Sequence, residues 1–164
     1  MENEGDGHGA SSLFRFVWGR VCMRVLALDI GEVRVGIAVC DPQGRVASPV
    51  CVLPAAEVEG MAGPFRRVLD DWEPELLVCG LPLTLAGEEG PQAQRIRAVA
   101  ERVSAQTRLP LEYADERLTS SEAKQVLRRQ GLNEKAMRGK VDMVAASLML
   151  QAWLDSRRAD EREE

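Results

Sequence analysis

The sequence predicts an α/β fold, a mixed five-stranded sheet with helices on both faces. Three observations predict it. Three apolar runs rich in β-branched residues follow one another, two further runs alternate with amphipathic patterns, and no segment repeats. The length of 164 residues suits one domain, and 45% hydrophobic residues can form a sizeable core. We expect this domain at 23–154, a disordered extension at 1–22, and a charged tail at 155–164.

The first three strands form an antiparallel meander in this prediction. We expect them at 24–28, 33–40 and 45–53, where apolar and β-branched residues dominate. The link between the first two is too short for a crossover, so it predicts a hairpin. Asp41-Pro42-Gln43-Gly44 has proline and glycine at turn positions, which predicts the second reversal.

The second half alternates helices with two short strands. A helix over 60–72 ends before Pro74, a buried strand follows at 76–79, and 81–90 reads as a loop rich in glycine and proline. The next helix, 91–106, repeats apolar residues at helical spacing, and a strand follows at 111–114. Thr119 and Glu122 have capping-box spacing and predict a helix to about 130, and the last helix is expected at 140–154.

Residue counts exclude several kinds of chemistry. The single histidine, His8, lies in the extension, so histidine-based catalysis and histidine-ligated zinc are not expected inside the fold. The four cysteines have no C-x-x-C spacing, which disfavours a zinc or dithiol site. No apolar run is long enough to span a bilayer, so we expect no membrane partner.

Three carboxylates stand at unusual positions. Asp29 ends the first strand, Glu116 follows the last strand, and Asp142 lies in the first turn of the last helix. Ligands of α/β sheets collect at the carboxyl ends of strands, so the three can converge there. Converging carboxylates repel one another unless a cation lies between them, and an all-oxygen ligand set suits Mg²⁺ or Mn²⁺. Such a cage is the usual apparatus for hydrolysing a phosphodiester.

Each carboxylate also has a purely structural interpretation. Asp29 could cap a turn, Glu116 could be a solvated loop residue, and Asp142 could stabilise the start of a helix through the macrodipole. Convergence of all three in this strand order favours the catalytic interpretation. We therefore predict Asp29, Glu116 and Asp142 as catalytic metal ligands.

Basic residues cluster between two of these carboxylates. The whole chain has a net charge of −5, but the segment 117–140 has seven basic and two acidic residues. We expect Arg117, Arg138 and Lys140 to contact substrate phosphates. Arg34, beside Asp29, could hold a carboxylate or a phosphate, and Thr84 could bind substrate or only its own loop.

The order of motifs resembles that of the YqgF/RuvX family. Its members are ribonuclease-H-fold proteins described as pre-16S rRNA nucleases or as Holliday-junction-resolvase-like proteins. The resemblance covers about residues 23–154 and is carried by four motifs: Asp29-Ile-Gly-Glu-Val-Arg34-Val-Gly36, Gly80-Leu-Pro82-Leu-Thr84 with Gly87 and Gly90-Pro91, Asp115-Glu116-Arg117-Leu118-Thr119, and Lys140-Val-Asp142-Met-Val-Ala145-Ala146.

This resemblance implies a fold, a site and a function. The fold would be ribonuclease-H-like, and Asp29, Glu116 and Asp142 would be the metal-binding catalytic carboxylates. The protein would be cytoplasmic and would trim the 5′ end of a ribosomal RNA precursor. This sequence departs from the family at Val33, where many members have lysine, and at Thr84 and Ala86, where they have asparagine and aspartate.

Other functions remain open at this point. A Holliday-junction resolvase, acting on branched DNA as a dimer, would use the same motifs, so the chain is expected to be a monomer or a homodimer. A non-catalytic ribosome-assembly factor would have no use for acidic residues facing phosphates. An ATPase of the actin, sugar-kinase or heat-shock-chaperone type has a similar first loop, but such proteins need two copies of the unit.

Overall fold

The computed structural model describes residues 23–116 and 119–163. Five strands form one sheet in the order β3-β2-β1-β4-β5. β1 (Val25–Ile30), β2 (Arg34–Cys40) and β3 (Ala47–Pro54) are antiparallel, and β4 (Leu76–Leu81) and β5 (Leu111–Asp115) continue the sheet in parallel with β1. The predicted mixed sheet is confirmed; the predicted extension at 1–22 lies outside the described residues.

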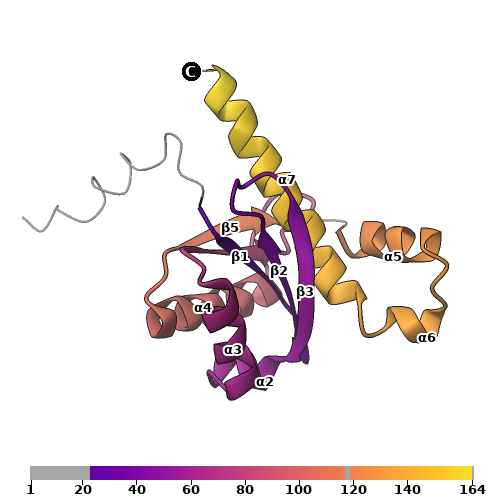
Figure 1. Ribbon diagram of the computed structural model, residues 1–164, viewed down its shortest axis with the longest axis horizontal. Coiled ribbons are helices and arrows are strands. Elements are labelled where there is room, and N and C mark those ends of the chain that lie inside the picture. The colour runs from indigo at the N-terminus through magenta and orange to yellow at the C-terminus, as the bar shows by residue number, and fades with distance from the viewer. Residues whose placement is uncertain (1–22, 117–118, 164) are drawn as a thin grey trace, which may run out of the picture.

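Helices cover both faces of this sheet (Figure 1). The short α2 (Ala55–Glu59), α3 (Gly63–Trp72) and α4 (Pro91–Thr107) pack on one face. α7 (Val141–Glu163) crosses the opposite face, and α5 (Thr119–Arg129) and α6 (Glu134–Met137) pack beside it. None of the described helices combines the length and apolar character that a bilayer crossing needs.

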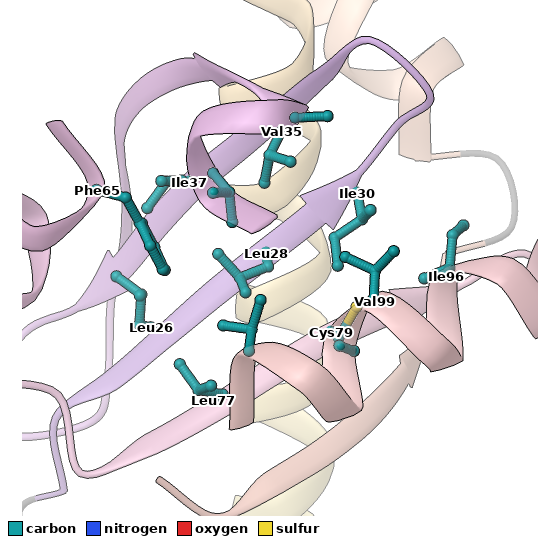
Figure 2. Packing of buried hydrophobic residues seen from close by; sticks show 14 of the residues in the cluster. Leu26, Leu28, Ile30, Val35, Ile37, Phe65, Leu77, Cys79, Ile96 and Val99 are labelled. Atoms are coloured by element: carbon teal, nitrogen blue, oxygen red, sulfur yellow. The ribbon is translucent and has the colours of Figure 1, made fainter. Parts of the chain in front are cut away.

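Alternation along the strands divides the core into two layers. Leu26, Leu28 and Ile30 of β1 face α3 and α4, where they meet Phe65 and Val99 (Figure 2). The intervening Val25 and Ala27 face α7 and pack with its Met149 and Leu150. Because β1 is buried on both faces, its sequence is a continuous apolar run, and Asp29 is the one acidic residue in it.

Two predicted boundaries were wrong. The helix expected at 60–72 begins at Gly63, as α3, because Met61 has a positive φ of 51° that an α-helix does not accept; the short α2 at 55–59 was not expected. α7 continues to Glu163, so the segment expected as a tail is helical. Arg157 explains this extension, since its guanidinium binds Glu112 of β5 at 2.5 Å and lies over the Trp153 ring at 4.5 Å.

Candidate active site

Two of the predicted carboxylates meet on the α7 face of the sheet. Asp29 continues the row of Val25 and Ala27, and its side chain is almost fully buried. Glu116 comes directly after β5, and its backbone N–H donates to the carbonyl of Leu81 at 3.2 Å. A Cβ at Gly80 would lie 2.6 Å from a Glu116 carboxylate oxygen, so the missing side chain of this glycine makes room for that carboxylate.

The carboxyl groups of Asp29 and Glu116 lie next to each other, and each shifts the pKa of the other. Burial raises the pKa of Glu116 to about 9, and the neighbouring Asp29 carboxyl contributes to the rise. Burial also raises the pKa of Asp29. Asp142 adds negative charge that raises both pKa values. At neutral pH the pair therefore holds a proton. A cation bound at the same place would balance the negative charge of both carboxylates.

Asp142 reaches this edge because α7 packs backbone to backbone against β2. Gly36 is the register partner of Asp29 across the β1–β2 ladder. A Cβ at Gly36 would overlap the carbonyl of Asp142 and crowd the N–H of Met143 at 2.7 Å. The first turn of α7 therefore rests directly on the strand next to Asp29, and only glycine permits this approach.

We expect Gly36→Ala to destabilise the protein by at least about 2 kcal/mol, because the new methyl group must push α7 off the sheet. Urea unfolding measures this loss. Gly63→Ala is the matched control, since no atom lies within 4 Å of a Cβ built at that helical position. An unchanged unfolding free energy for Gly36→Ala would contradict the close packing.

The carboxylate of Asp142 binds Arg34 instead of joining the other two. The Arg34 Nε lies 3.0 Å from Asp142 Oδ2. Within 23–116 and 119–163, no three acidic, histidine or cysteine side chains converge closely enough to hold one ion. The structure thus brings Asp29 and Glu116 into contact and places Asp142 beside them with its charge directed to Arg34.

The other predicted substrate residues lie at different places around this edge. Arg138 lines a groove of about 350 Å³ together with Arg34, Lys124 and Asp142, whereas Lys140 is exposed just before α7. Arg117 lies outside the described residues.

Thr84 takes part in its own loop. Its Oγ1 accepts a hydrogen bond from the Glu88 N–H at 3.1 Å, and its backbone N–H donates to the Glu88 carbonyl. A contact between Thr84 and substrate stays a prediction.

Arg97, on α4, is a further residue of this region that sequence reasoning missed. It braces the loop between β4 and α4: its Nε donates to Glu89 at 3.2 Å, and its guanidinium lies 4.3 Å from the centre of the Tyr113 ring. Glu89 in turn forms a bridge with Leu83 that closes the loop. Glu89 lies before the start of α4 and Arg97 eight residues later on it. Because this is not the three- or four-residue spacing of ion pairs within a helix, the sequence does not predict that the two residues interact.

Arg97→Ala should leave the fold intact and loosen this loop. We expect hydrogen exchange at the amides of Gly87 and Glu88 to accelerate about tenfold, because the loop loses its tie to α4. Exchange followed by mass spectrometry measures this. Arg102→Ala is the control, since Arg102 lies on the same helix and pairs with Glu59 instead. Equal exchange in both variants would remove Arg97 from this role.

The donor set fits a hard divalent cation. Asp29 and Glu116 are partly or fully buried acids that share a proton, and a cation can replace that proton without separating them. Asp142 can join as a third oxygen donor after its side chain leaves Arg34. The cysteines of the described part do not compete: Cys40, Cys51 and Cys79 are free thiols whose pKa values are raised by burial.

Comparisons with known proteins find relatives that match most of the chain. The family model described as "RuvX: Holliday junction resolvase" matches residues 23–156. A "Putative pre-16S rRNA nuclease" from Chloroflexus aurantiacus is 40% identical over 136 residues, which are 83% of this chain and 89% of that one. One of the same name from an Anaeromyxobacter species is 42% identical over 137 residues, 84% of this chain and 100% of that one.

A solved structure resembles the fold. The yeast mitochondrial Holliday junction resolvase Ydc2 superposes with a TM-score of 0.50 at 15% identity, over 92% of this chain and 86% of that chain. An identity this low speaks for the shared fold alone.

Proposed function

Because this chain belongs to the RuvX family, we propose that it is a divalent-metal-dependent nuclease that processes the 5′ end of pre-16S rRNA during ribosome biogenesis. The observation that carries this proposal is the contact between Asp29 and Glu116, with Asp142 beside them, at the carboxyl edge of the sheet. The relatives named as pre-16S rRNA nucleases match over nearly their whole length, which supports the choice of substrate. We expect the protein to act in the cytoplasm, where this precursor is made.

Asp29, Glu116 and Asp142 would hold the Mg²⁺ or Mn²⁺ ions. When bound, such ions stabilise charge on the phosphate and lower the pKa of an attacking water. The chain itself contributes by holding the three carboxylates in place. Burial of Asp29 in β1 and the space at Gly80 fix two oxygen donors, while Gly36 fixes the backbone that presents the third. The substrate backbone would lie along the groove of Arg34, Lys124 and Arg138.

A direct assay tests this function. Purified full-length protein is incubated with end-labelled pre-16S rRNA, or with a four-way DNA junction, in Mg²⁺, Mn²⁺ or EDTA. We expect the RNA to be shortened at its 5′ end in either metal and to stay intact in EDTA. Cleavage of the junction in preference to the RNA would support the resolvase alternative, which the family description favours. Binding of RNA without cleavage would support a ribosome-assembly factor.

Oligomeric state separates the two nucleases further. Symmetric cutting of a junction needs two active sites and therefore a homodimer. Trimming of one RNA end needs only one site, so a monomer suffices. Light scattering of the protein with and without each nucleic acid measures which form binds.

A further inference from the structure

The contact between Arg34 and Asp142 joins an exposed side chain to a more buried one. Arg34 begins β2 two residues before Gly36, and Asp142 lies in the first turn of α7 on top of that glycine, so both backbones are held. The Arg34 side chain is 53% exposed, whereas that of Asp142 is 29% exposed. The guanidinium can therefore swing into solvent while the position of Asp142 stays the same.

This contact opposes metal binding at Asp142. The Arg34 charge lies 3.0 Å from Asp142 Oδ2 and neutralises the carboxylate that a cation would need. A second cation placed beside the guanidinium is repelled by it. Of the three predicted metal ligands, which all lie in the described part of the chain, Asp29 and Glu116 contact each other, whereas Asp142 is paired with Arg34. The free protein thus presents an incomplete set of ligands.

A groove next to Arg34 offers the guanidinium another partner. Lys124 of α5 and Arg138 after α6 line it with Arg34, and neither forms an ion pair with any described residue. The one glutamate in the lining, Glu134, is paired with Arg128 at 3.1 Å. The lining has three basic and two acidic side chains, and both acids, Glu134 and Asp142, are already paired with arginines. This balance favours an anion in the groove, and a guanidinium binds a phosphate through two parallel hydrogen bonds.

We propose that Arg34 is a positioning residue that exchanges Asp142 for a phosphodiester oxygen of the substrate. Entry of a nucleic-acid backbone into the groove draws the guanidinium away and leaves Asp142 available to the metal. Substrate and metal then bind cooperatively, and by linkage each raises the affinity for the other equally. The inference rests on the proposed function for its substrate class, but its test depends on binding alone.

Binding of Mn²⁺ to the full-length protein tests the exchange. Electron paramagnetic resonance measures the Mn²⁺ affinity with and without a 2′-O-methyl RNA oligonucleotide, which resists cleavage. We expect the oligonucleotide to tighten Mn²⁺ binding about tenfold in the parent protein. In Arg34→Gln we expect Mn²⁺ to bind several-fold more tightly than in the parent without RNA, and the effect of RNA to fall close to one.

Lys124→Gln is the charge-matched control, because Lys124 lines the same groove and makes no ion pair with Asp142. It should weaken RNA binding and keep the tenfold coupling. Arg34→Lys, which retains a charge but lacks the planar fork, should restore part of the coupling. The proposal is overturned if RNA leaves the Mn²⁺ affinity of the parent unchanged, or if Arg34→Gln binds Mn²⁺ more weakly than the parent in the absence of RNA.

These outcomes are separate from those of the cleavage assay. Cooperative binding without any cleavage would leave the role of Arg34 intact and contradict the nuclease function. Cleavage without cooperative binding would support the nuclease function and contradict the role of Arg34. The two proposals therefore stand or fall on different measurements.

Discussion

Asp29→Asn should reduce cleavage of pre-16S rRNA by about a thousandfold while RNA binding stays near that of the parent. Asp29 is the buried member of the carboxyl pair, and asparagine has the same shape but no charge for a cation. Charge stabilisation by a bound metal contributes several kcal/mol to the transition state, and about 4 kcal/mol corresponds to three orders of magnitude in rate. The RNA contacts are expected in the groove of Arg34, Lys124 and Arg138, which this substitution leaves unchanged.

Single-turnover cleavage with purified parent and variant measures the effect, and filter binding in Ca²⁺ measures affinity. Asp71→Asn is the matched control, because this exposed aspartate of α3 lies on the helix layer of the opposite face. The comparison also controls for a contaminating nuclease, since a contaminant would cut equally in every preparation. Equal rates for Asp29→Asn and the parent would falsify the catalytic assignment.

Glu116→Gln should stabilise the metal-free protein at alkaline pH. Glu116 has a folded pKa of about 9, against an ordinary value of 4.5. A carboxyl whose pKa is raised by folding favours the folded state fully below its unfolded pKa, and that contribution is lost as the pH rises through the folded pKa. The parent should therefore lose up to about 4 kcal/mol of unfolding free energy between pH 5 and pH 8. Glutamine has no proton to lose and removes most of this slope.

Urea unfolding in EDTA across this pH range measures the slope for each protein. Adding Mg²⁺ at pH 8 should raise the stability of the parent by mass action and leave Glu116→Gln nearly unchanged. Glu122→Gln serves as the control, because Glu122 is an exposed glutamate of α5. A parent protein whose stability is the same at pH 5 and pH 8 in EDTA would show that Glu116 does not keep its proton.

The sequence predicted the parts of the site that depend on strand order. Asp29 is the one acidic residue in a run that is otherwise apolar, and the mixed sheet places the end of β5 two strands from β1. In α7 the small Ala146 is fully buried against the sheet, which allows the helix to approach closely. The apolar pattern and the order of the strands were therefore sufficient to predict that the acidic residues lie at one edge of the sheet.

Other features of the structure depend on contacts between distant residues, which the sequence pattern does not predict. Arg34 could have met a phosphate or any of several carboxylates, and only the position of α7 directs it to Asp142. The four-residue α6 is too short for periodicity and is capped by the Asn133 side chain, which accepts from the Ala136 N–H at 2.9 Å. The extension of α7 beyond Leu154 depends on Glu112, forty-five residues away from Arg157 in the sequence.

The packing of α7 on Gly36 has a consequence for synthesis of the protein. A ribosome completes all five strands by residue 115, and Asp142 is added only afterwards. Until α7 emerges and docks, Asp29 and Glu116 lack their third acidic neighbour, and the apolar row of Val25 and Ala27 lies uncovered. A growing chain therefore lacks the complete set of three acidic residues until α7 has been synthesised and has docked on β2.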